Sequence, residues 1–319
     1  MIGGVNFGAI SRQAKSVKLP TMNTKLVHVI NDFVELQLDG RPLFRYSYAP
    51  TFDPYESRKP FMHPIYTLKG NPITIYRPHD HVWHKGIQMT NAHLSGENFW
   101  GGPTYVDGKG YVKLDNVGRM QHVAWDEMTC EGEHVGLVHR LKWITTKGQE
   151  WIEEVRTIRV AEIKPDEGFW SLHWTMKLKN VAGKTLEFGS PTTAGRENAG
   201  YGGLFWRGPR EFEKGTIRAG GGLEGPDTMG KRAPWISFIG THDQTADKST
   251  IVFVDRPGNP NFPIKWFVRS EPYACISTSF SFDEEVPLEP GKEMTLNYRT
   301  VFADGEWKAE RLEGYVKTL

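Results

Sequence analysis

The sequence predicts an all-β protein, built as one large antiparallel β-sandwich with a short C-terminal helix. Residues 170–179, WSLHWTMKLK, alternate apolar and polar side chains, as expected for a strand that buries one face and exposes the other. Residues 294–302 repeat this period of two. Short clusters of Gly, Pro, Asn and Asp separate such segments, and many strands joined by short turns are typical of sandwiches and barrels.

Strand candidates follow one another along most of the chain. They are residues 26–38, 43–48, 73–76, 86–91, 111–125, 135–145, 151–160, 170–179, 185–188, 235–240, 250–254, 266–282 and 294–302. Residues 287–294, PLEPGKEM, are expected to form a loop and turn before the last strand. The tail alone has a helical pattern, because Asp304 can cap a helix over residues 306–316 whose apolar side chains share a face.

The length of 319 residues suits a single large β domain. We expect residues 1–24 to form an N-terminal extension and residues 25–319 to form the sandwich. Residues 1–20 lack the continuous apolar segment of a signal peptide, and no stretch approaches the roughly 18 apolar residues that a membrane helix needs. These features predict a cytoplasmic protein in which Cys130 and Cys275 are reduced thiols.

The charge and the aromatic content narrow the class of partner. With 39 basic and 38 acidic residues the formal net charge is +1, which argues against a nucleic-acid-binding protein. Aromatic residues make up 12% of the chain. Their flat apolar faces suit a strand core, and they also suit the face of a sugar ring. The expected partner is a small-molecule carbohydrate, and the oligomeric state stays open.

Residues 77–86, RPHDHVWHKG, gather three histidines and an aspartate. Imidazole titrates near neutral pH, so His79, His81 and His84 can act as acids, bases or metal ligands. In an extended chain His79 and His81 point to the same side, and His84 joins them only if a turn intervenes. Proton transfer to a substrate and binding of a divalent ion both stay open as functions. The structural alternative is a hydrogen-bonded polar loop at the entrance of a strand.

Two further pairs of polar residues lie on predicted strands. Arg119 and His122, in GRMQH, can reach a shared anion or hydroxyl, although two separate surface residues give the same pattern. Glu154 and Arg156 share a strand face. A fixed cation there would lower the pKa of the carboxyl group and position it for chemistry, whereas an exposed cross-strand ion pair would contribute little.

Two histidines on predicted strands are expected to have different surroundings, one on a polar face and one in the core. His173 lies on the polar face of residues 170–179, where it is either solvated or lines a concave surface. His139 alternates with Leu137 and Leu141 and is expected to lie in the core with its hydrogen bonds satisfied.

Two long irregular stretches, residues 91–110 and 191–234, contain aromatic residues and arginines among many glycines. Long loops without regular structure are usually functional or disordered, and these aromatic side chains favour function. In the second stretch, which also contains Arg196, glycines surround Tyr201, Trp206 and Arg207, and glycine lets a backbone approach a ligand closely. We interpret this segment as a binding loop.

Residues 255–263, DRPGNPNFP, run into a segment with aromatic and basic residues. The proline turns would fix Asp255 and Asn259 near the start of a strand, and Trp266 and Arg269 follow. A sugar site needs such a mixture of carboxylate, amide, aromatic plate and cation. A stiff loop with a purely structural role is the alternative.

Together, the segments HDHVWHKGI, ENFWGG, GRMQH, YGGLFWRGPR, NPNFPIKWFVR and PLEPGKEMTLNYR resemble the DUF6807 family, also labelled "methane oxygenase PmoA", over roughly residues 25–305. The family's first motif has the form HPHHRGL. This chain matches it at His81, His84 and Gly86, carries Lys85 at the basic position, and departs from it at Val82 and Trp83.

The resemblance implies a galactose-mutarotase-like supersandwich, a fold class that includes aldose epimerases and some polysaccharide lyases. In those proteins His and acidic side chains on a concave sheet act on a sugar. We therefore expect an epimerase- or lyase-type enzyme that acts on a sugar or an oxidised (keto) sugar or glycoside by proton transfer. The alternatives are a non-catalytic carbohydrate-binding protein and a metal-dependent sugar hydrolase or lyase.

These expectations assign roles to specific residues. The expected catalytic residues are His81, His84, His173, Glu154 and Asp255. The expected substrate-binding residues are His79, Arg119, His122, Arg196, Tyr201, Arg207, Asn259, Trp266 and Arg269. No cofactor is predicted with certainty; if a divalent metal is bound, its ligands are His79, His81 and His84. The hypothesis requires residues 79–84, 196–207 and 255–269 to meet around one hollow.

Overall fold

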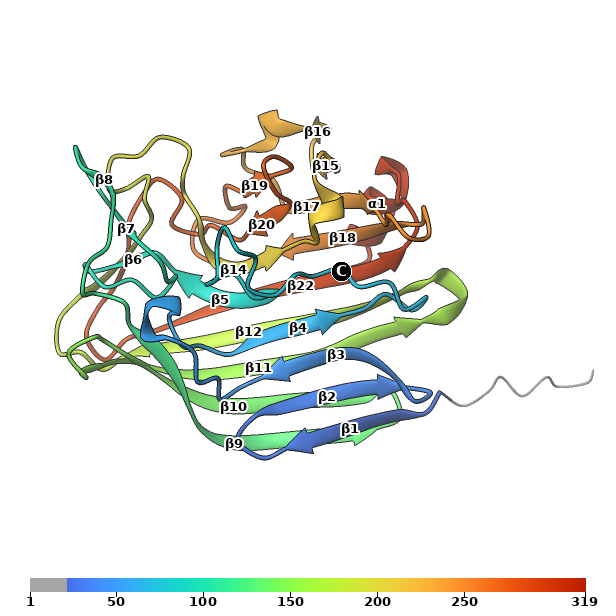
Figure 1. Ribbon diagram of the computed structural model, residues 1–319, viewed down its shortest axis with the longest axis horizontal. Helices are drawn as coiled ribbons and strands as arrows, with labels where there is room; N and C mark the ends of the chain where they lie inside the picture. Colours follow the sequence, from blue (N-terminus) through green and yellow to red (C-terminus); the bar gives the residue numbers. More distant parts are fainter. Residues whose placement is uncertain (1–21) are drawn as a thin grey trace, which may run out of the picture.

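The computed structural model describes residues 22–319, and in this range two large antiparallel sheets face each other (Figure 1). The expected N-terminal extension, residues 1–24, lies outside the described residues except for its last three. In spatial order the eight-stranded sheet consists of β1 (Thr24–Val29), β2 (Phe33–Leu38), β3 (Arg41–Ser47), β4 (Phe61–Ile65), β5 (Ile87–Asn91), β14 (Gly202–Arg207), β20 (Cys275–Ser277) and β19 (Phe267–Arg269).

The second large sheet has nine strands in the described range. In spatial order they are β16 (Leu223–Glu224), β15 (Thr216–Ala219), β17 (Trp235–Thr241), β18 (Lys248–Asp255), β22 (Glu293–Asp304), β12 (Phe169–Asn180), β11 (Glu150–Lys164), β10 (His134–Ile144) and β9 (Arg119–Glu131). Two smaller sheets lie beside them: β21 (Val286–Leu288) with β13 (Leu186–Gly189) and β6 (His93–Leu94), and the hairpin of β7 (Thr104–Val106) and β8 (Gly110–Val112). The predicted antiparallel sandwich is confirmed.

The core lies between the two large sheets and follows the predicted alternation. In β12 the apolar side chains of Trp170, Leu172, Trp174 and Met176 are buried in the main core. Each such side chain stabilises the fold by about 1.5–3 kcal/mol through the apolar surface that it removes from water. The polar side chains between them, including His173, therefore lie on the opposite face of the sheet.

The short helix α1 (Ala309–Val316) packs against part of the outer face of the nine-stranded sheet, near β18 and β22. Trp307 and Leu312 pack there against Val301 and other outward side chains of the sheet. The predicted C-terminal helix is confirmed, but Asp304 is not its cap. Asp304 ends β22 and pairs with Ser249 of β18, so its backbone is still extended and the helix begins five residues later.

Several strand boundaries differ from the predicted ones. Residues 73–76 form no strand, and residues 266–282 divide into β19 and β20, which pair antiparallel as a hairpin with Pro272 in the turn between them. The stretch 191–234, predicted as irregular, contains β14, β15 and β16. Strand β14 has a central position in its sheet, and this strand supports the candidate site described below.

Glu154 and Arg156 form an ion pair inside the sandwich. The Arg156 guanidinium donates to both carboxylate oxygens of Glu154 at 2.6 and 2.9 Å, and the indole of Trp143 donates to the same carboxylate at 2.7 Å. Arg156 also donates to the hydroxyl of Tyr46 on the facing sheet. Glu154 is 1% exposed between the sheets and does not line the cavity described below, and the pair joins the two layers.

We predict that Glu154→Ala lowers the free energy of unfolding by about 3–5 kcal/mol, because it leaves the Arg156 charge buried without a partner. Urea unfolding followed by tryptophan fluorescence measures the change. Glu153→Ala is the matched control, since Glu153 is the exposed neighbour on the same strand. Equal midpoints for the two variants would contradict a structural role for the buried pair.

Candidate functional site

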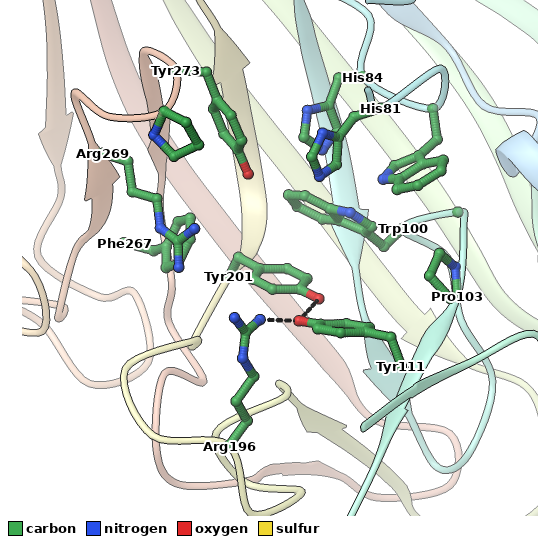
Figure 2. Close-up of a pocket in the computed structure, with 13 residues that line it drawn as sticks. His81, His84, Trp100, Pro103, Tyr111, Arg196, Tyr201, Phe267, Arg269 and Tyr273 are labelled. Atoms are coloured by element: carbon green, nitrogen blue, oxygen red, sulfur yellow. Dashed lines mark hydrogen bonds between the residues drawn. The ribbon is translucent and has the colours of Figure 1, made fainter. Parts of the chain in front are cut away.

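A cavity of about 350 Å³ lies against the face of the eight-stranded sheet that points away from the sandwich core (Figure 2). Alternation along β14 turns Leu204 and Trp206 into the core and Phe205 to the opposite face. In β19 the same alternation turns Phe267 and Arg269 outward, where both line the cavity. The floor of the cavity is therefore the outer surface of a hydrogen-bonded sheet.

Residues 77–86 form two successive turns above this floor. The amide of His81 donates to the carbonyl of Pro78 at 3.0 Å, and the amide of His84 donates to the carbonyl of His81 at 2.9 Å. The second turn stacks the two imidazoles, with centroids 4.7 Å apart and planes 16° from parallel. Because the chain is turned rather than extended, His79 lies apart on the surface, where the Arg210 guanidinium donates to its Nδ1.

Two glycines permit close approaches that other residues would block. Gly86 has φ +56°, and a Cβ there would lie 2.2 Å from the carbonyl oxygen of Met62. A Cβ on Gly102 would lie 2.6 Å from the ring of Trp83, which lines the cavity. The glycines of the HKG and WGG segments therefore hold the histidine loop and an aromatic wall in place.

His81 has one ring nitrogen fixed by its neighbour in the chain. Its Nδ1 lies 2.9 Å from the carboxylate of Asp80, which also accepts from Arg207 at 3.1 Å and from Arg210 at 2.9 Å. Partial burial works against the charged carboxylate, but hydrogen bonds from His81 and Arg207 hold the pKa of Asp80 well below its usual range. An ionised carboxylate only accepts hydrogen bonds, so the proton of neutral His81 is on Nδ1 and its Nε2 keeps a lone pair.

The basicity of His81 suits a proton acceptor at neutral pH. Burial lowers the pKa of His81 and the Arg207 and Arg269 charges lower it further, while Asp80 offsets part of the decrease. The imidazole is therefore uncharged above its usual pKa of about 6.5. Figure 2 shows its ring directed into the space between Tyr273 and Trp100.

His84 has the opposite tautomer. The Arg207 guanidinium, which has donors alone, lies 3.0 Å from His84 Nδ1, so that nitrogen accepts and the proton is on Nε2. Burial, together with the nearby cations, keeps the pKa of His84 well below its usual range. Nε2 is buried and has no hydrogen-bond partner among the described residues. His84, one of the lining residues, thus carries a neutral N–H donor that lacks an acceptor and that its neighbours cover.

Aromatic side chains form most of the cavity wall. The rings of Trp100 and Tyr201 lie 4.4 Å apart, and Tyr201 contacts Phe267 at a centroid distance of 5.4 Å. The ring of Tyr273 covers the guanidinium of Arg207, with Cζ 3.6 Å from its centroid. Burial raises the pKa of the Tyr273 hydroxyl, which therefore keeps its proton over the physiological pH range.

Two guanidinium groups lie at the edge of the cavity. Arg196 donates to the hydroxyl of Tyr111, which lies 2.9 Å from the hydroxyl of Tyr201 (Figure 2). Arg269 lies against Phe267, with Cζ 5.1 Å from the ring centroid. Among the residues that the structure describes, neither Arg196 nor Arg269 has a carboxylate within ion-pair distance. Both positive charges are available to a ligand.

The cavity brings together part of the predicted site. His81, His84, Arg196, Tyr201 and Arg269 line it. Arg207 is buried directly behind it, where it holds the ring nitrogen of His84. Segments 79–84 and 196–207 thus meet, together with residue 269 of the third segment.

Other predicted residues lie elsewhere. His173 is on the outer face of the nine-stranded sheet, so the whole sandwich core separates it from the cavity. Arg119 and His122 are on β9, where His122 contacts the buried His139 at 3.0 Å between their Nδ1 atoms. His139 is in the core, as its alternation predicts.

The loop after β18 is held together by its own hydrogen bonds. Asp255 accepts hydrogen bonds from Asn259 at 2.7 Å and from the amide of Ile264 at 3.0 Å, and burial raises its pKa to about 6. Trp266 is fully buried, with its indole donating to the carbonyl of Ala233. Asp255, Asn259 and Trp266 do not line the cavity, and their hydrogen bonds lie within the loop and with the backbone of neighbouring segments.

The three histidines of residues 77–86 do not converge as metal ligands. Within residues 22–319 no group of three or more His, Cys, Asp and Glu side chains is placed to hold a metal ion. The Nδ1 atoms of His79 and His84 face guanidinium groups, and that of His81 faces Asp80. The predicted metal set is therefore not assembled.

Sequence reasoning missed several residues of the site. Phe267 could have been found, because its spacing of two from Arg269 places both on one strand face. Asp80 stands inside the histidine motif but received no role of its own. The EPYAC segment contains no pattern that singles out Tyr273. The residues missed are Asp80, Trp83, Trp100, Tyr111, Phe267 and Tyr273.

The sequence matches one protein family over nearly its whole described length. DUF6807, described as a family of unknown function, matches residues 33–317. The chain belongs to the DUF6807 family. This confirms the resemblance that the motifs predicted. None of the curated proteins compared with this DUF6807 member matches it.

Solved structures similar to this DUF6807 chain include a galactose 1-epimerase from Lactobacillus acidophilus NCFM, with 11% sequence identity, a TM-score of 0.38, and coverage of 89% of this chain and 100% of the other. A GH36 α-galactosidase, AgaA from Geobacillus stearothermophilus, has 9% identity and a TM-score of 0.37 over 91% of this chain. An α-galactosidase from Lactobacillus brevis has 8% identity and a TM-score of 0.38 over 88% of this chain. The DUF6807 chain spans 40% and 39% of these two α-galactosidases.

Over residues 22–319, the structure contains no helix with the length and apolar character that crossing a membrane requires.

We predict that the His84 imidazole stays uncharged, with its proton on Nε2, when the pH is lowered from 8 to 5.5. Burial lowers its pKa, and Arg207 occupies the nitrogen that would have to gain a proton. Selective ¹⁵N-histidine labelling and NMR measure both ring nitrogens. An imidazolium at neutral pH, or a proton on Nδ1, would contradict the assignment. Arg207→Leu should abolish the tautomer preference.

Proposed function

We propose that this protein is an enzyme that removes a proton from a carbon next to a carbonyl or carboxyl group of a carbohydrate. One observation carries the proposal. The imidazole of His81, which a carboxylate orients, and the neutral imidazole of His84, which has an N–H donor, stack on each other in the wall of one cavity. General acid–base chemistry needs such a base and donor beside each other, each in a fixed protonation state.

In the proposed reaction, Nε2 of His81 takes the proton from the α-carbon, and the C–H electron pair moves into an enolate. The enolate oxygen accepts a hydrogen bond from His84 Nε2–H, which has no other acceptor among the described residues and which a ligand reaches when the aromatic rings that cover it move aside. Asp80 stabilises the His81 imidazolium that forms. Protonation of the opposite face of the carbon by a second donor, water or a tyrosine hydroxyl, gives an epimer, and His81 releases its proton to solvent.

Elimination starts from the same enolate. If the β-carbon carries a leaving oxygen, the enolate electron pair forms the new C=C bond and the C–O bond breaks. The Tyr273 hydroxyl lines the cavity and keeps its proton, so it is the group that we assign to protonate the leaving oxygen. The epimerase and lyase outcomes differ in the substrate's leaving group and share their first step.

The cavity wall supports a carbohydrate as the substrate. Trp83, Trp100 and Tyr201 present flat apolar faces, and sugar rings place C–H groups on such faces while their hydroxyls reach polar neighbours. A volume of about 350 Å³ suits a small molecule of one or two sugar units. The gathering of His81 and His84 favours an enzyme over a binding module, which needs only the aromatic faces.

We predict that His81→Gln lowers kcat/KM by about 10²–10⁴-fold on a sugar substrate that the wild-type protein converts. Proton exchange from solvent D₂O into recovered substrate, followed by mass spectrometry, measures the abstraction step even when no net product accumulates. His79→Gln is the matched control, because His79 is two residues away and outside the cavity. Equal exchange rates in wild-type protein and His81→Gln would exclude His81 as the base.

The pH dependence is a separate prediction. The base must be uncharged to accept a proton, and the pKa of His81 is lowered from its usual 6.5. The kcat/KM value should therefore be constant at neutral pH and fall below about pH 6.5, once pH drops through the His81 pKa. A profile that rises as the pH falls through this range would contradict a neutral imidazole base.

A further inference from the structure

The cavity wall has an unusual charge composition. It contains two guanidinium groups and two imidazoles, and no Asp or Glu of the described chain is among its lining residues. The carboxylate next to the lining residue His81 in the sequence is that of Asp80. It already accepts hydrogen bonds from His81, Arg207 and Arg210. The positive charges of Arg196 and Arg269 therefore have no counter-charge within the wall.

Arg269 is the cation best placed to receive an anionic group. It is half-buried on the outward face of β19, and its guanidinium rests on the ring of Phe267. No hydrogen bond from its side chain to another described residue is present. Arg207, by contrast, is used to hold His84 and Asp80, and Arg196 donates to Tyr111. The planar fork of Arg269 is thus the free site for two parallel hydrogen bonds.

We propose that the substrate of this site is a sugar acid, a uronate-type carbohydrate, whose carboxylate is bound by Arg269. The inference rests on the proposed function and deepens it. A carboxylate is planar and matches a guanidinium bidentately, and a cavity wall with two guanidinium groups and no Asp or Glu among the described residues favours a ligand that supplies negative charge.

In this assignment the substrate carboxylate also takes part in the chemistry. In a uronate the ring C–H next to the carboxylate is the acidic one, and its removal spreads negative charge over both carboxylate oxygens. Arg269 stabilises that charge from one side and His84 Nε2–H from the other, while His81 accepts the proton. If the neighbouring carbon carries a glycosidic oxygen, that C–O bond breaks and an unsaturated uronate forms, with no oxidant or reductant needed. A phosphate elsewhere on a sugar would not acidify this C–H, so we assign the guanidinium to a carboxylate.

Binding tests the inference without requiring turnover. Isothermal calorimetry is carried out on His81→Gln protein, which retains the cavity but lacks the base. The probes are D-glucuronate, D-galacturonate and their 1,4-linked disaccharides, each with its uncharged methyl ester, and glucose 6-phosphate as the phosphate arm. We expect at least one uronate to bind ten-fold or more tightly than its methyl ester, and more tightly than the phosphate.

Substitution of Arg269 tests the residue assignment. In the same background, Arg269→Gln should weaken uronate binding ten-fold or more and leave ester binding within two-fold. The uronate affinity of Arg269→Lys should lie between those of the His81→Gln parent and the Arg269→Gln variant, because lysine keeps the charge and loses the planar fork. Arg140→Gln is the control for net charge, since Arg140 is exposed on β10 and does not line the cavity. Circular dichroism and thermal unfolding verify that each variant is folded.

The outcomes separate the two proposals. Equal binding of acid and ester, tighter binding of the phosphate, no binding of any uronate, or unchanged uronate binding in folded Arg269→Gln would each overturn the carboxylate assignment. Arg269-dependent uronate binding without proton exchange in the wild-type protein would keep the assignment and overturn the proposed chemistry. If the wild-type protein and Arg269→Gln convert a neutral keto-sugar at the same rate, the proposed chemistry is kept and the carboxylate assignment is overturned.

Discussion

The site depends on one buried cation. Arg207 is 1% exposed, and its guanidinium contacts His84, Asp80 and the ring of Tyr273 at once. These contacts fix the tautomer of one histidine, orient the carboxylate that fixes the other, and place an aromatic wall. A lysine could not replace it, because an ammonium group has no planar set of donors for several partners in different directions. Arg207 itself is held in β14, whose other face is in the core.

Alternation made much of the fold predictable from sequence. In residues 170–179 the period of two identifies both the core face and the polar face, and the structure has them where the sequence places them. The same rule, applied from Arg269, selects Phe267 and rejects Trp266, which is three residues away and therefore on the opposite face. Trp266 was predicted as a sugar platform because composition was considered there without the strand period.

Other parts of the site follow from contacts between distant segments, which a single sequence does not specify. Asp255 and Glu154 are carboxylates with suitable neighbours, and only their burial within the loop and the core shows that those neighbours are structural partners. Tyr273 enters the site because β20 pairs with β14, seventy residues earlier in the chain. The position of His84 over His81 required a turn that the spacing allowed but did not dictate.

Because β14 is packed on both faces, it limits which positions of this protein can be substituted. Its even-numbered large side chains, Leu204 and Trp206, are packed in the core, and its odd-numbered ones, Phe205 and Arg207, support the cavity. Any shift of this backbone would disturb close-packed side chains on both sides. Substitutions that alter what the cavity holds should therefore be tolerated more readily in the loops that carry Trp100 and Arg196, and in the β7–β8 hairpin that carries Tyr111, than in β14.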